Sequence, residues 1–185
     1  MSTLDGKTIA VLTSQEGVER AELEQPLADI RAAGGTAVHL APSLDAVQSM
    51  VGDTDKDDTF TPDQTIGDVS VDDFDALVIP GGTVNADHVR GDEASVALVK
   101  AFVDAGKPIA SICHGPWALV EAGVLPDKTL TSFPTLRTDI TNAGGTWVDE
   151  QVKHCTAAGW DLITSRNPDD LDAFTAKITE VVGAR

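Results

Sequence analysis

The chain has 185 residues, which is the size of one domain with a substantial core, and we expect residues 1–185 to form that single domain. Its formal net charge of -17 at pH 7 repels nucleic acids and anionic membranes, so neither is expected as a partner. No apolar run approaches the roughly 20 residues that cross a bilayer, and the first residues lack a basic segment followed by an apolar one, so we expect a cytoplasmic location.

The acidic residues are spread along the chain, with a local concentration of five aspartates between Asp53 and Asp63. Carboxylates keep a protein surface hydrated in a salty cytoplasm, where the salt screens their mutual repulsion. We therefore expect a halophilic source, with an ordinary acidic protein as the alternative. This expectation concerns habitat and solubility, and it does not bear on the reaction.

Apolar runs typical of buried strands alternate along the chain with segments of helical spacing. The predicted strands cover residues 8–12, 37–41, 76–79, 108–112, 146–148 and 160–164. The predicted helices cover residues 22–33, 93–105, 117–122 and 135–143, and a last helix begins at Pro168. This alternation predicts an α/β sandwich with a mostly parallel central sheet.

Two segments are expected to depart from the alternation. The acidic stretch 52–73 is the first, and within it residues 59–61 and 66–71 are predicted to pair as a small hairpin at the edge. Residues 152–164 are the second, and they read as two strands joined by a turn.

A cysteine, followed directly by His, Gly and Pro, lies between two apolar runs in the segment ASICHGPWALVEAGVL at residues 110–125. The apolar run before Cys113 predicts a buried strand, and the run after Pro116 predicts a helix that ends at Gly123. Cys113 therefore lies at a strand-to-helix turn, where the helix dipole favours a thiolate by about 0.3–2 kcal/mol. We expect a lowered thiol pKa, lowered further by a nearby His114 imidazolium. The alternative is a buried structural cysteine.

Gly81 and Gly82 follow the predicted strand at 76–79. In open parallel sheets, sites form at the carboxyl ends of the strands. We therefore expect the backbone N–H groups of Gly82 and His114 to point at one spot and to hold a developing oxyanion. The alternative is that Pro-Gly-Gly is an ordinary turn.

The other cysteine and the remaining histidines give weaker indications of a function than Cys113 does. The two cysteines are too few for a disulfide framework or a zinc cluster, and Cys155 is interpreted as an incidental thiol. We interpret His39 as a satisfied strand residue, and His88 as an interface or surface residue. No metal and no cofactor are predicted, because a metal site built from His39, His88 and His154 would need the fold to bring these three separate residues together by coincidence.

Four motifs occur in one order along the chain: GVERAELEQPL, ALVIPGG, SICHGPWAL and LITSRNPDDLDAF. Together they resemble the ThiJ/PfpI superfamily, specifically its PfpI-type intracellular proteases and general stress proteins, over nearly the full chain. The resemblance implies a flavodoxin-like three-layer sandwich, in a domain of the class I glutamine amidotransferase-like type. It also implies that the cysteine lies on a nucleophile elbow.

The resemblance implies roles for individual residues. Glu22 matches the carboxyl that hydrogen-bonds the cysteine sulfur, and His114 pairs with Cys113. Asp87 matches an acid that orients this histidine from a neighbouring subunit, so a homo-oligomer of at least two chains is expected. Asp replaces the Glu of some relatives at this position, which shortens its reach.

Two departures from the family pattern bear on the site. The loop TSQEGVE is one residue longer than usual, which leaves Glu16 and Glu19 as alternatives to Glu22. Trp117 stands where relatives often have Gln, which alters the pocket wall. An ionised Glu22 would raise the pKa of the thiol by like-charge repulsion, so we expect Glu22 to be protonated and to donate a hydrogen bond to the sulfur. The alternative is that Glu22 is an exposed acid at a helix start.

Two classes of function follow. The first is a stress-related, cofactor-independent enzyme in which a Cys113 thiolate acts on small aldehydes, their protein adducts or peptides, as a glyoxalase, deglycase or hydrolase. The second is a redox-sensing or chaperone-like stress protein with an oxidisable Cys113 and no important turnover. Glutamine amidotransferase chemistry is disfavoured because the tail SRNPDDLDAF lacks the His and Glu which that reaction places late in the chain.

Overall fold

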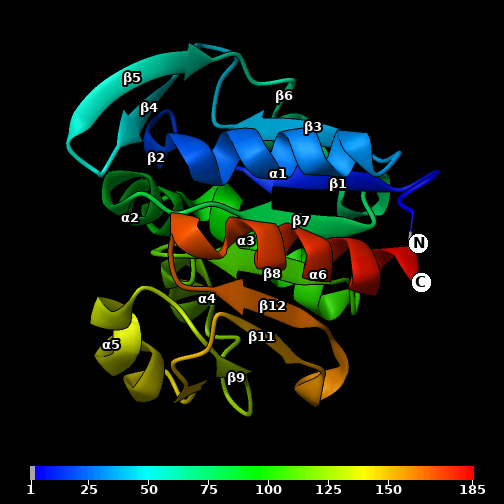
Figure 1. The fold of residues 1–185 in the computed structure, drawn as a ribbon, viewed down its shortest axis with the longest axis vertical. Helices are drawn as coiled ribbons and strands as arrows, with labels where there is room; N and C mark the ends of the chain where they lie inside the picture. Colours follow the sequence, from blue (N-terminus) through cyan, green and yellow to red (C-terminus); the bar gives the residue numbers. More distant parts are fainter. Residues whose placement is uncertain (1–2) are drawn as a thin grey trace.

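The computed structural model describes residues 3–185 and has a seven-stranded sheet between two layers of helices (Figure 1). The strand order is β11-β12-β8-β7-β1-β3-β6, and every neighbouring pair is parallel except β11 with β12. The strands are β1 (Thr8–Leu12), β3 (Thr36–Ala41), β6 (Gln64–Thr65), β7 (Ala76–Ile79), β8 (Ile109–Ile112), β11 (Val152–Cys155) and β12 (Leu162–Ser165). The predicted flavodoxin-like sandwich with a mostly parallel sheet is confirmed.

Helices cover both faces of this sheet. In Figure 1, α1 (Arg20–Ala32) and α6 (Leu171–Gly183) lie side by side on one face. On the other face pack α3 (Glu93–Asp104) and α4 (Trp117–Ala122), with α2 (Thr83–Gly91) against both of them. Successive residues of β1 point to opposite faces: Val11 joins the core beneath α1 and α6, and Leu12 joins the core on the other face. Because both faces are covered, the central strands β1, β7, β8 and β12 have nearly continuous buried sequences, and this is why they were predictable.

A second, two-stranded sheet and several short turns accompany the main sheet. The pair β9 (Thr129–Leu130) and β10 (Thr146–Trp147) is parallel, and α5 (Arg137–Asn142) lies between them in the chain. Short 3-10 turns occupy Ile66–Asp68, Val71–Asp73, Pro134–Leu136, Ala157–Gly159 and Pro168–Asp170. The predicted helix at 135–143 is therefore a 3-10 turn followed by α5, and the predicted pair of strands at 152–164 is confirmed as antiparallel β11 and β12.

The predicted edge hairpin between residues 59–61 and 66–71 is wrong. Instead, β5 (Asp55–Phe60) pairs antiparallel with β4 (Val47–Val51), and β4 pairs with β2 (Glu16–Glu19) in a separate three-stranded sheet. Only Val47 and Ser49 of β4 are buried, so the strand has no apolar run to reveal it. Helix α2 was also missed, because it has few apolar residues and directly follows the glycine pair.

His39 is buried within β3, 2 % exposed, and is satisfied by short hydrogen bonds. Its Nε2 atom lies 2.8 Å from Thr13 Oγ1, and its backbone N–H donates to Asp63 Oδ2 at 2.8 Å. Burial lowers the pKa of His39 to about 4, so the imidazole is neutral at pH 7. The interpretation of His39 as a satisfied strand residue is confirmed.

We predict that His39→Gln flattens the acid side of the stability profile. The unfolded chain binds a proton at His39 near pH 6.5 and the folded chain only near pH 4, so the wild type loses stability as the pH falls through this window. That loss reaches as much as about 3 kcal/mol, whereas glutamine does not titrate. Urea unfolding between pH 7 and pH 4 measures the slope, with His88→Gln at an exposed histidine as the control. A slope equal to that of the wild type would contradict the prediction.

Candidate active site

Cys113 follows β8 directly and has a backbone φ of 59°, in the left-handed region that side-chain-bearing residues rarely adopt. Its backbone N–H donates to Ser165 O at 3.2 Å, and its carbonyl accepts from the Phe133 N–H at 2.9 Å. These bonds to flanking segments hold the strained conformation in place. The predicted strand-to-helix turn with a cysteine at its apex is therefore present.

In the loop after β7, Gly81 and Gly82 lie directly against this turn because neither residue carries a side chain. A Cβ atom on Gly81 would lie 2.5 Å from Glu22 Oε2 and 2.7 Å from Cys113 Cβ, closer than atoms pack. Gly82 has a φ of 85°, and its backbone N–H and that of His114 lie close enough to the Cys113 sulfur to act against the rise in the pKa of its thiol. The two donors expected at one spot are brought together there.

Glu22 lies in the first turn of α1 with its side chain fully buried. Its Oε2 atom accepts a hydrogen bond from the Gly81 N–H at 2.7 Å, and the carboxyl contacts the Cys113 side chain. Within residues 3–185, Oε1 finds no hydrogen-bond partner of normal geometry. Burial, together with the nearby Glu19 and Asp53, raises the pKa of Glu22 to about 8. The carboxyl is thus protonated at pH 7, and the alternative of an exposed helix-start acid is wrong.

Burial raises the pKa of the Cys113 thiol, which is 5 % exposed, and a charged Glu22 would raise it further. The N–H groups of Gly82 and His114 act in the opposite direction. The lowered thiol pKa expected from the helix dipole is therefore wrong, because α4 has only six residues and the burial of the thiol outweighs it. A protonated Glu22 removes the repulsion, so Glu22 and Cys113 titrate as a coupled pair.

His114 lies beside the thiol, with its Nδ1 atom 3.2 Å from Cys113 Sγ. Its Nε2 atom lies 3.5 Å from Thr135 Oγ1, and its ring stacks on Phe133 at 4.8 Å and meets the edge of Trp117 at 5.3 Å. Burial lowers the pKa of His114. The imidazole is therefore neutral at pH 7, so the expected imidazolium is not supported.

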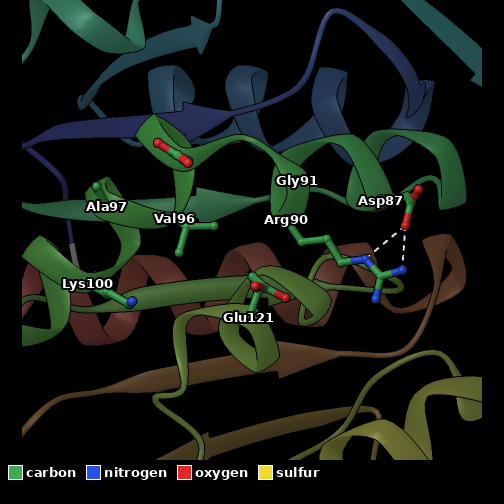
Figure 2. Close-up of a pocket in the computed structure, with 8 residues that line it drawn as sticks. Asp87, Arg90, Gly91, Val96, Ala97, Lys100 and Glu121 are labelled. Carbon is green, nitrogen blue, oxygen red and sulfur yellow. Dashed lines mark hydrogen bonds and ion pairs between the residues drawn. The ribbon is translucent and has the colours of Figure 1, made fainter.

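Asp87 is exposed and is not brought to His114 within one chain. Figure 2 shows its side chain pointing toward Arg90, whose Nε donates to Asp87 Oδ1 at 2.9 Å. The Arg90 guanidinium lies 4.5 Å above the Trp117 ring, which in turn contacts His114. Asp87 and Arg90 line a surface cavity of about 670 Å³ between α2, α3 and α4.

The three acids considered as partners of the thiol, Glu16, Glu19 and Glu22, lie in different surroundings. Glu22 contacts Cys113, whereas Glu19 accepts hydrogen bonds from the backbone N–H groups of Gly52 and Asp53 at 3.2 and 3.1 Å. Glu16 is exposed and lies 4.0 Å from His88. The longer loop therefore leaves Glu22 at the thiol. Asp53 is a neighbour of the site that the sequence did not indicate, since no motif contains it and only the packing of the turn between β4 and β5 brings it close.

The described part of the chain, residues 3–185, has no group of three or more His, Cys, Asp or Glu side chains arranged to hold a metal ion. No helix of these residues is long and apolar enough to cross a membrane. His154 pairs with Asp161, and its Nε2 atom lies 2.7 Å from Asp161 Oδ1.

The fold and this turn define a class of protein, an α/β sandwich with a cysteine at the carboxyl end of a central parallel strand. A model of the DJ-1/PfpI family matches residues 7–181. The chain belongs to the DJ-1/PfpI family, and the resemblance drawn from the four motifs is confirmed.

Two relatives and one solved structure show the extent of the likeness. Protein/nucleic acid deglycase 2 of Escherichia coli is 35% identical over 182 residues, 96% of this chain and 99% of the relative. General stress protein 18 of Bacillus subtilis is 44% identical over 114 residues, 62% of this chain and 64% of the relative. The crystal structure of a ThiJ/PfpI domain protein from Brachyspira murdochii shares the fold, with a TM-score of 0.87 at 19% identity over 98% of this chain and 99% of that one. These names support a stress-related function of the DJ-1/PfpI type.

We predict that Gly81→Ala disrupts the site. Its Cβ would lie 2.5 Å from Glu22 Oε2 and 3.0 Å from the His114 nitrogen, so these groups must move apart. We expect a loss of roughly 1–3 kcal/mol in the free energy of unfolding, together with a changed rate of Cys113 alkylation. Gly91→Ala, whose Cβ meets open space among the described residues, is the matched control. Equal unfolding midpoints for the two variants would show that the close contact of Gly81 with Glu22 and His114 does not affect the free energy of unfolding.

We predict that Glu22→Gln and Glu22→Ala separate the two effects of this carboxyl on the thiol. Glutamine has an amide that can donate a hydrogen bond to the sulfur, as a protonated carboxyl can, and it never becomes charged, so half-maximal alkylation should require a pH no higher than in the wild type. Alanine removes the donor, so its profile should move to higher pH. The measurement is the iodoacetamide rate across pH, in a Cys155→Ala background that leaves one cysteine. Superimposable profiles for all three proteins would rule out a proton-donating Glu22.

Proposed function

We propose that this protein is a cytoplasmic, stress-related, cysteine-dependent glyoxalase or deglycase that acts on small aldehydes such as methylglyoxal and on their protein adducts. One observation carries the proposal: the Cys113 thiol lies between a carboxyl that is protonated at pH 7 and a neutral imidazole. One neighbour can give a proton and the other can take one. That pairing fits a reaction whose central event is the transfer of a proton between two carbons.

The proposed reaction begins when His114 takes the thiol proton and the Cys113 sulfur attacks the aldehyde carbon of methylglyoxal. The new alkoxide points at the Gly82 and His114 N–H groups and accepts a proton to form a hemithioacetal. His114, neutral again once the alkoxide has been protonated, then removes the proton from the former aldehyde carbon and delivers it to the adjacent carbon. The hydroxyl proton moves to the neighbouring ketone oxygen, with the protonated Glu22 as a proton donor, which leaves a thioester of lactate on Cys113. Water hydrolyses the thioester, releasing lactate and the free thiol.

The burial of the site favours a small substrate over a peptide. Cys113 and His114 are each 5 % exposed, and the ring of His114 is enclosed by Trp117 and Phe133. A two- or three-carbon aldehyde needs little space, whereas a peptide would have to displace these aromatic side chains. The name of the Escherichia coli relative, a deglycase, supports the same substrate class.

A redox sensor is the competing function. A sensor needs the same Cys113 thiolate as the enzyme, but it does not need the imidazole of His114 beside the sulfur or the protonated carboxyl of Glu22, so these two neighbours favour the enzyme.

The placement of Asp87 supports a second part of the proposal, a homo-oligomer. Its carboxylate lies on the surface beside a cavity, where it can reach the His114 of another copy once that copy covers this face.

We predict that the wild type converts methylglyoxal to lactate in molar potassium chloride and that Cys113→Ala does not. Cys155→Ala is the matched control, because it removes the other thiol of the chain and should keep full activity. The measurement follows methylglyoxal consumption together with lactate formation. A folded wild type without turnover would reject the glyoxalase proposal and leave peptide hydrolysis or peroxide sensing to be tested.

A further inference from the structure

Asp53 ties a turn of the small sheet to the start of α2. It lies in the turn between β4 and β5 with a φ of 64°. Its Oδ1 atom accepts a hydrogen bond at 2.7 Å from the backbone N–H of Thr83, the first residue of α2. Its own backbone N–H donates to Glu19 Oε2 at 3.1 Å, and the Gly52 N–H donates to Glu19 Oε1 at 3.2 Å.

Gly82, the residue before Thr83, is held between this connection and the thiol. A Cβ on Gly82 would lie 2.6 Å from the Glu19 nitrogen and 3.0 Å from the Val18 carbonyl carbon, so the backbones of the two segments are in direct contact. The Gly82 N–H also lies near the Cys113 sulfur, where it favours the thiolate. The contacts therefore close a ring, from Glu19 to Asp53, from Asp53 to Thr83, and from Gly82 back to Glu19.

We propose that Asp53, itself held by Glu19, is a positioning residue that fixes the Gly82 N–H where the oxyanion of the reaction develops. The inference rests on the proposed function, since it concerns the same Cys113 chemistry. Asp53 touches no reacting atom in this arrangement and acts through Thr83. An N–H donor stabilises an oxyanion only when it is held in place beforehand, and a misplacement of about 1 Å costs roughly a hundredfold in rate.

The charge of Asp53 gives a second reason to assign it a positional role. A carboxylate at this place opposes the formation of a thiolate, because it raises the pKa of Cys113 and that of Glu22. Its negative charge therefore works against the nucleophile. The hydrogen bond to Thr83 is the favourable contribution that this side chain makes to the site.

Two substitutions separate the hydrogen bond from the charge. Asp53→Asn and Asp53→Gly both remove the charge, and both residues tolerate a positive φ. Only asparagine retains an oxygen that can accept from the Thr83 N–H. We expect Asp53→Asn to keep the kcat for methylglyoxal within about threefold of the wild type. We expect Asp53→Gly to lower kcat by roughly tenfold to a hundredfold while KM stays within about twofold, because the donor acts in the transition state.

The control is Asp127→Gly, at an exposed aspartate that also has a positive φ, 66°, and lies outside the site. It should keep the kcat of the wild type, which separates the loss of the hydrogen bond from the effect of glycine on the backbone. Equal losses in Asp53→Asn and Asp53→Gly would overturn the proposal and assign the role to the charge. Full activity in both variants would overturn it as well.

A second measurement keeps this inference independent of the proposed turnover. The Gly82 N–H favours the thiolate of Cys113, so a displaced Gly82 should move the alkylation profile of Cys113 to higher pH. We expect Asp53→Gly to require a higher pH than Asp53→Asn, both in a Cys155→Ala background. If the wild type shows no turnover and this difference is present, the proposed function fails and the positioning role stands. Identical profiles would reject the positioning role itself.

Discussion

The contact among Glu22, Gly81 and Cys113 is the constraint on which the rest of the site depends. It buries a carboxyl group that has one backbone donor and no cation beside it in the described part of the chain. Such a group can stay in place only as the neutral acid, because an unpaired charge is too costly in the interior. The site therefore contains a stored proton next to its sulfur, and α1, β7 and β8 must meet closely enough to enclose both.

The parts of this arrangement that were predictable follow from the parallel sheet. Strands covered on both faces have continuous apolar sequences, and their carboxyl ends meet at one edge, which brings Gly82 and Cys113 together. Glu22 was placed by the family resemblance. The small sheet was not predicted, because β4 buries only two side chains and its pairing with β2 depends on contacts distant in sequence. Asp53 belongs to that sheet, so it was missed together with it.

The electrostatic prediction failed for a different reason. A strand-to-helix turn is visible in the sequence, but the length of the helix and the depth of the sulfur are not. With six residues, α4 contributes a small dipole, while the aromatic rings of Trp117 and Phe133 enclose His114 and help to exclude water. Whether the helix dipole or desolvation dominates the pKa of the Cys113 thiol thus depends on side-chain packing, which cannot be deduced from the sequence pattern alone.

The backbone conformation of Cys113 shows that folding stability and the position of the reactive sulfur are in conflict at this residue. A residue with a side chain at a φ of 59° costs the folded state about 1–3 kcal/mol that a glycine would largely avoid. Selection for thermal endurance alone would therefore favour glycine at the apex of the turn. The presence of cysteine there means that folding stability has been given up at a single point, and the surrounding hydrogen bonds to Ser165 and Phe133 compensate for it locally.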